Sequence, residues 1–148
     1  MNKNQNGATT IEFALSLIVF FTFLLGIVDF GRMLFTWSAA NEAARVGARY
    51  AVVCDDTNNE AQVLRRMQGL LPQIAEIRVV WYAEEGPACT PSTCDGVTVT
   101  IVNLDYQWIS PIAGLATRIA PVRMPTFSTY LPREMMRQDP NSEALCST

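Results

Sequence analysis

Residues 7–35 decide the fold, and they read GATTIEFALSLIVFFTFLLGIVDFGRMLF. The run from Phe13 to Val28 has no charged residue, and Ile11 before it and Phe30 to Phe35 after it extend its apolar character. A helix needs about 20 apolar residues to span a bilayer. We therefore expect a helix that lies in lipid or in a bundle of similar helices, with a transmembrane part over about residues 11–35. Glu12 interrupts this stretch, and a carboxylate at mid-membrane costs about 2.5–3.5 kcal/mol on insertion scales.

The composition argues against an enzyme and against a nucleic-acid partner. The chain has 148 residues, a formal net charge of −3 and no histidine, and its basic residues form no cluster. Histidine is the commonest general base and the commonest metal ligand. Oxygen ligands for calcium would have to come from Glu84-Glu85 with Asp95, or from Asp55-Asp56, but neither group has the ordered ligand spacing of a calcium loop. We predict solvated acidic turns there, and no catalytic residue, cofactor or metal site.

The four cysteines predict disulfides. Cys54, Cys89, Cys94 and Cys146 form an even set, which is typical of a small domain in an oxidising compartment, and their spacing does not suit zinc. Four cysteines allow three pairings. We favour Cys89–Cys94, which lie close together in a Pro/Gly-rich loop, and this leaves Cys54 to pair with Cys146.

Three interpretations of the N-terminal segment remain open from the residues alone. A cleaved signal peptide would use Ser38-Ala39-Ala40, but this site lies about ten residues beyond the apolar run, and Glu12 is unusual inside a signal. A plain signal anchor fits the length, and positive charges on both sides, such as Lys3 and Arg32, leave its orientation undecided. The third interpretation is a pilin-type segment, in which a short polar leader ends at a glycine, four residues and a glutamate follow, and an apolar helix continues.

The motifs favour the third interpretation. The segment Gly7 to Phe13 resembles the prepilin peptidase recognition sequence of type IV pilins, although Ala8 stands where those pilins often have phenylalanine. Residues 26–34 (GIVDFGRML) and 41–52 (NEAARVGARYAV) resemble the TadE family, the pseudopilins of tight-adherence (Tad) pilus systems. Asp29 stands where that family usually has glutamate. The resemblance covers residues 7–52 well and the rest weakly.

The resemblance carries functional expectations. It implies cleavage between Gly7 and Ala8 by a prepilin peptidase, and a role for Glu12 in assembly through the free amino terminus of a neighbouring subunit. The chain would be a minor pilin or pseudopilin that helps to initiate or cap an adhesive Tad pilus. Its partners would be the peptidase, a second minor pilin, the major pilin and the Tad inner-membrane machinery. It would sit in the bacterial cytoplasmic membrane as a single-pass protein with its C-terminal domain outside. The alternative is a signal-anchored extracytoplasmic binding domain that enters no filament.

Local sequence patterns predict the secondary structure of the rest of the chain. Thr57 to Glu60 reads as a capping box, and apolar residues at helical spacing predict a short helix that Pro72 ends. Strands are expected over Ile77 to Ala83, from Val97 on to Tyr106, and over Val122 to Tyr130, where Pro125 indicates an edge or a bulge.

The predicted fold class is α+β and pilin-like. It consists of a leader (residues 1–7), a long helix (8–53) and an ectodomain (54–148) whose sheet of three to four antiparallel strands packs on the C-terminal half of the helix. Small residues from Ala40 to Ala48 suit that packing. Asp29 and Arg32, three positions apart, are expected to pair near the membrane boundary, either functionally or as an ordinary surface pair. Arg65 and Arg66 are expected on a solvated face.

Overall fold

The computed structural model describes residues 6–54, 60–83, 89, 94–109, 121–132 and 146. These residues fall into two compact units. The first comprises the chain up to Phe35 together with the segment that begins at Gln107. The second comprises Thr36–Tyr106 together with the segment that begins at Val122.

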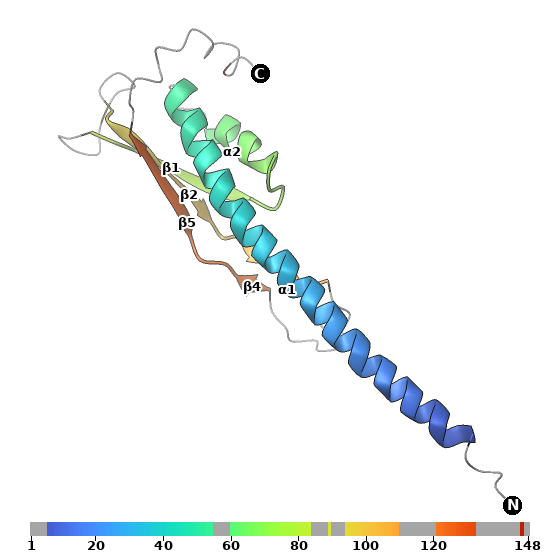
Figure 1. Cartoon of the computed structure of the whole chain (residues 1–148). Coiled ribbons are helices and arrows are strands. Elements are labelled where there is room, and N and C mark those ends of the chain that lie inside the picture. The colour runs from blue at the N-terminus through green and yellow to red at the C-terminus, as the bar shows by residue number, and fades with distance from the viewer. Residues whose placement is uncertain are drawn as a thin grey trace, which may run out of the picture. The chain divides into compact units, whose positions relative to one another are not determined.

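One long helix, α1 (Asn6–Cys54), contributes to both units (Figure 1). The sequence has no proline before Pro72, so nothing breaks the backbone hydrogen bonds of α1 over its 49 residues. The predicted helix therefore has the expected extent, and it begins one residue before Gly7 and ends at Cys54.

The short helix α2 (Glu60–Gln68) follows, as predicted, and it ends where Gly69 and Pro72 interrupt the helical pattern. Val63 and Met67 are fully buried on its inner face. Leu70 continues the apolar pattern of this face in the sequence, but it lies beyond the end of α2 and is exposed.

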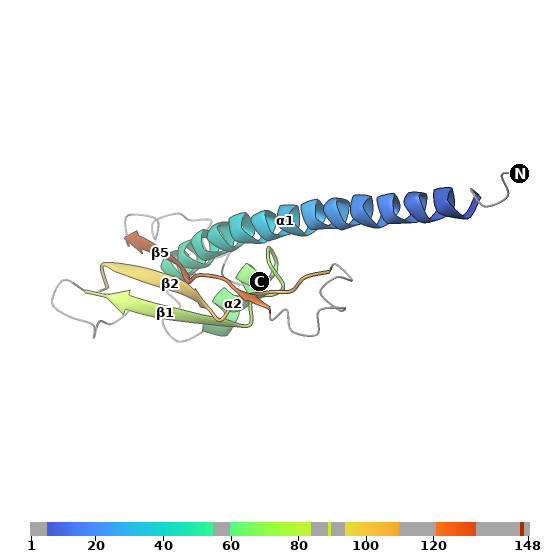
Figure 2. The ribbon, with the colours of Figure 1, turned by 90° about the horizontal axis from the view of Figure 1, so that it is seen from below.

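Three antiparallel strands form the main sheet in the order β1-β2-β5 (Figures 1 and 2). They are β1 (Glu76–Tyr82), β2 (Gly96–Val102) and β5 (Phe127–Pro132). Val79 pairs with Val99, and Val99 with Thr129. The buried residues of β2 alternate with half-buried threonines, as the sequence pattern predicted.

The predicted second and third strands are each shorter than expected. Asn103 adopts a positive φ of 54°, which ends β2 and separates it from β3 (Asp105–Tyr106). Pro125 has no N–H for a strand ladder, and the chain around it separates β4 (Val122–Arg123) from β5. β3 and β4 pair with each other in a second, two-stranded sheet.

The C-terminal half of α1 forms one side of the core of the second unit. In both ribbon views the main sheet lies along this half of the helix. Ala40, Ala43, Ala44 and Ala48 have no exposed surface. A Cβ at Gly47 would lie 2.5 Å from Met67 Sδ, so the absence of a side chain lets α2 approach α1 closely. The prediction that these small residues serve packing within the subunit is confirmed.

Two further contacts join aromatic side chains of α1 to the rest of the second unit. Trp37 packs edge-on against Phe127 of β5, with ring centroids 5.2 Å apart. The Tyr50 hydroxyl hydrogen-bonds the side-chain carbonyl oxygen of Gln62 in α2 at 2.6 Å.

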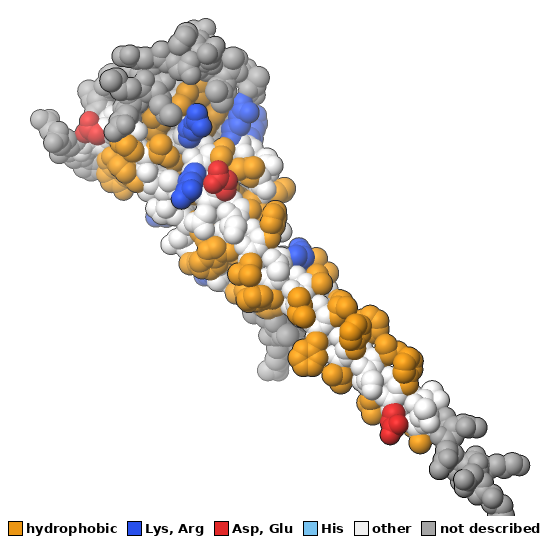
Figure 3. All heavy atoms as spheres, viewed as in Figure 1, with side chains coloured by type: hydrophobic (Ala, Val, Ile, Leu, Met, Phe, Trp, Pro, Cys, Tyr) orange, Lys and Arg blue, Asp and Glu red, His pale blue; other side chains and the backbone are white. Residues whose placement is uncertain are grey.

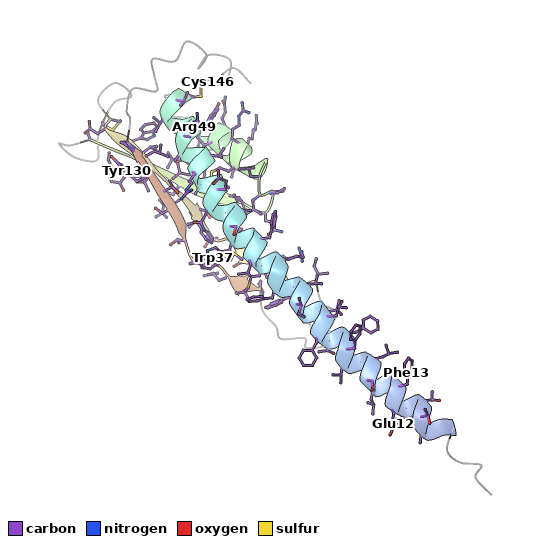
Figure 4. All side chains as sticks on the ribbon, viewed as in Figure 1. Glu12, Phe13, Trp37, Arg49, Tyr130 and Cys146 are labelled. Carbon is purple, nitrogen blue, oxygen red and sulfur yellow. A yellow bond between two sulfur atoms is a disulfide. The ribbon has the colours of Figure 1, made fainter. Side chains whose placement is uncertain are left out.

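Both disulfides have the pairing favoured from the sequence. Cys54 at the end of α1 is bonded to Cys146, and Cys89 is bonded to Cys94 (Figure 4). Several predicted features lie outside the described residues, namely the leader through residue 5, the capping box at 57–59, most of the 84–93 loop, the connection over 110–120 and the chain after Pro132 apart from Cys146.

Substitution of Gly47 by valine tests the close approach of the two helices. We expect Gly47→Val to lower the free energy of unfolding by about 1–3 kcal/mol, because the added methyl groups overlap Met67 and Val63. Thermal unfolding of the full chain in detergent micelles measures the change. In a Met67→Ala background the same substitution should cost much less, and an equal cost in both backgrounds would contradict the assignment.

The two disulfides are expected to stabilise the domain unequally. Cys54–Cys146 spans 92 residues and Cys89–Cys94 spans 5. By loop-closure entropy, the Cys54→Ser/Cys146→Ser variant should lose about 4–5 kcal/mol and the Cys89→Ser/Cys94→Ser variant about 2 kcal/mol. Urea unfolding of both variants beside the oxidised parent checks this order, and a reversed order would refute it.

Candidate functional site

The sequence-predicted residues at the start of α1 lie on its exposed surface. Gly7, Ala8 and Glu12 are all exposed, and a Cβ at Gly7 would meet no atom within 4 Å. Figure 4 shows Glu12 and Phe13 projecting from this end of the helix. Ala8 and Glu12 are four residues apart, so they lie on the same face about one helical turn from each other.

The stretch of α1 that follows exposes large apolar side chains in every direction. Figure 3 shows hydrophobic side chains gathered along this part of the helix. The exposed large residues of the stretch are Ile11, Phe13, Leu15, Ile18, Val19, Phe20, Phe21, Phe23, Leu24, Ile27, Val28, Phe30, Leu34 and Phe35. A helix that is apolar on all sides is stable only inside a bundle or in lipid. Among the described residues, α1 is the helix that is long and apolar enough to cross a membrane, which suggests membrane anchoring.

Asp29 lies near the end of this apolar stretch, yet it is only 2% exposed. Its Oδ1 accepts a hydrogen bond of 3.1 Å from the backbone N–H of Ile109, 80 positions further along the chain. The same oxygen lies 3.9 Å from an Arg32 guanidinium nitrogen. The expected charge pair is therefore present, but Asp29 is not part of an ordinary surface pair because its carboxylate is buried and accepts a hydrogen bond from Ile109.

This arrangement lowers the cost of carrying a carboxylate beside a membrane. Charged side chains at membrane depth pair with one another or with backbone groups. Asp29 has both kinds of partner, since Arg32 supplies a cation and Ile109 supplies a backbone donor. Hydrogen bonds that involve a charged group contribute about 1.5–3 kcal/mol. The contact therefore holds the backbone of Ile109 against α1.

Four arginines of the second unit lie on the two helices. Arg45 and Arg49 are exposed on α1, and Arg65 is exposed on α2, as predicted. Arg66 differs from the expectation of a solvated face, because its guanidinium lies 5.4 Å from the ring centroid of Tyr50. It contributes a cation–π contact to the packing of α2 on α1.

A surface hollow of about 410 Å³ lies at one end of the main sheet, lined by Tyr82, Ala83, Asp95 and Tyr130. Tyr130 covers Gly96, where a Cβ would lie 2.5 Å from its hydroxyl oxygen, and packs edge-on against Tyr82 at 6.5 Å. The aromatic residues therefore have a packing role, since they cover a glycine in the sheet.

The described part of the chain contains no group of three or more Cys, Asp or Glu side chains placed to hold a metal ion. The candidate pairs Asp55-Asp56 and Glu84-Glu85 lie outside that part. Asp95 is exposed, and its backbone N–H donates to the carbonyl of Tyr82 at 2.8 Å.

Sequence reasoning missed the role of Ile109. The backbone N–H of any residue other than proline can donate to a carboxylate, so the identity of Ile109 does not indicate its contact with Asp29. The signal in the sequence was Asp29, because a carboxylate near the end of an apolar helix needs a partner.

The Asp29 contact is testable by amide hydrogen exchange of the full chain in micelles. Asp29→Ala removes the acceptor, so we expect the Ile109 amide to exchange about tenfold faster or more. Asp29→Asn keeps an oxygen at the same reach and should preserve most of the protection. Glu12→Ala, at the other end of the apolar stretch, serves as the control. Unchanged exchange in Asp29→Ala would show that the contact does not hold this segment.

Comparison with known proteins agrees with the motifs. Residues 7–49 match the sequence model of a family described as TadE-like protein. No curated protein and no solved structure matches the chain. The family match begins at the glycine before the apolar helix, includes Glu12, Asp29 and Arg32, and ends inside the part of α1 that packs in the second unit. The resemblance seen in the sequence is thus confirmed for this region: residues 7–49 are TadE-like.

Proposed function

We propose that this protein is a minor pilin or pseudopilin that a prepilin peptidase processes between Gly7 and Ala8. It then takes part in the initiation or the tip of a Tad pilus used in adhesion. The observation that carries the proposal is an exposed carboxylate, Glu12, one helical turn after Ala8 at the start of an exposed apolar helix. A match to the TadE-like family over this region supports it.

The chemistry of Glu12 explains why processing and assembly would be linked. When apolar helices pack together, a carboxylate between them becomes a buried charge, which is costly without a cationic partner. Cleavage after Gly7 creates a new α-amino group on Ala8. The ammonium of one subunit can pair with Glu12 of its neighbour, whereas the uncut chain would have an amide at that position.

The proposal defines the partners and the location. The exposed apolar surface of α1 would contact a second minor pilin and the major pilin, with the Tad inner-membrane machinery driving assembly. The protein would sit in the cytoplasmic membrane with its disulfide-bonded domain outside, since disulfides persist in oxidising compartments. It would be the substrate of an enzyme rather than an enzyme.

The N-terminal residue and intact mass of the protein from native membranes test the processing step. We expect a chain that begins at Ala8. A chain that retains Met1 would instead support the signal-anchored binding domain, and a chain that begins near Asn41 would support a secreted domain. Either result would refute prepilin processing.

The Glu12→Ala variant tests the assembly step. We expect normal membrane insertion and normal cleavage but a severe loss of surface pili, counted by electron microscopy and by pilin in sheared fractions. Glu42→Ala is the matched control, because Glu42 is an exposed acidic residue of the same helix outside the apolar stretch. Wild-type piliation in Glu12→Ala cells would remove the proposed role of this carboxylate.

A further inference from the structure

We propose that residues 107–109 form a second membrane-contacting element, which Asp29 holds at the boundary between the lipid headgroups and the acyl chains. The occupant of this surface would be lipid rather than another protein. The proposal depends on the membrane-anchoring helix and not on pilus assembly.

The position of Asp29 along α1 sets the depth of this element. Glu12 and Asp29 are the charged residues that limit the apolar run, and 17 helical positions separate them. At a rise of 1.5 Å per residue this separation is about 26 Å, close to the hydrocarbon thickness of about 30 Å. A bilayer centred on the run therefore has Asp29 near one of its two interfaces. The hydrogen bond from Ile109 to Asp29 brings residues 107–109 to the same level.

The side chains at that level suit lipid. Ile109 is 66% exposed, although it is bonded through its backbone to a buried carboxylate. Ile27 and Phe30, which flank Asp29 in the sequence of α1, are 73% and 55% exposed. Trp108 is half-buried, and tryptophan is enriched where proteins cross the interface between membrane and water.

The exposed apolar surface of α1 beside Asp29 indicates that lipid covers residues 107–109. Ile27, Val28 and Phe30 flank Asp29 on α1 and are more than half exposed, so lipid that covers the helix at this level also meets Ile109. Gln107, Trp108 and Ile109 carry no charge, which suits a segment at a membrane interface. A contiguous apolar patch of this kind marks a membrane or protein contact.

Depth-dependent quenching of Trp108 tests the proposal. The chain has three tryptophans, so Trp37→Phe/Trp81→Phe leaves Trp108 as the fluorophore. The full chain is reconstituted in phosphatidylcholine vesicles that contain lipids brominated either near the headgroup or near the end of the acyl chain. We expect shallow bromines to quench Trp108 at least twofold more than deep bromines do. In the matched control, Trp37→Phe/Trp108→Phe, the remaining Trp81 lies in β1, and we expect little quenching at either depth.

Two variants separate lipid contact from misfolding. Ile109→Asp places a charge at the contact and should reduce the shallow quenching of Trp108 at least twofold, while the circular dichroism spectrum stays that of the parent. Asp29→Ala should do the same by releasing the segment, whereas Asp29→Asn should not. Absence of quenching by lipid at both depths would overturn the proposal, as would quenching that is equal for Trp108 and Trp81. A blue shift of Trp108 emission that depends on protein concentration without lipid quenching would also overturn it, because a second copy would then cover this surface.

Discussion

The apolar part of α1 has no stable place in water, and the other features of the molecule follow from this constraint. Phenylalanines such as Phe13 and Phe23 are more than half exposed, and apolar surface left in water costs about 25 cal/mol per Å². The second half of the same helix meets a different environment. There the inner face has small residues such as Ala40 and Gly47, while the outer face has Arg45 and Arg49. The helix α1 therefore has an apolar part and a part that packs in the second unit, and its sequence changes from one kind to the other near Thr36.

The two carboxylates that limit the apolar run have different environments. Asp29 is buried and has its partners, Arg32 and Ile109, within its own chain. Glu12 is exposed, and no described residue forms an ion pair with its side chain. The carboxylate of Asp29 has its partners within the subunit and needs no second chain. Glu12 lies at the start of an apolar helix, and its carboxylate would need a cationic partner only when another helix covers it.

Local signals were sufficient for the elements and for the break at Pro125, but not for the end of β2 or for the buried contact. The alternation through Val97 and Ile101 predicted β2 because one face of the sheet is buried. Its end depended on Asn103, whose left-handed backbone is one of several conformations that asparagine tolerates. Pro125 gave the break before β5 a clear chemical cause. The partner of Asp29 was invisible, because a backbone N–H 80 positions away has no sequence signature.

The division of the chain into two units indicates which contacts would change if α1 left a bilayer. The contacts that hold the second unit begin at Thr36, after the apolar stretch, and the Cys54–Cys146 disulfide ties the far end of α1 to that unit. Transfer of residues 11–35 from lipid into a bundle of helices would therefore leave this core intact. The Asp29–Ile109 hydrogen bond lies in the other unit, beside the surface that would change its surroundings. If residues 107–109 contact lipid, helices that replaced the lipid would have to cover Ile109 as well as α1.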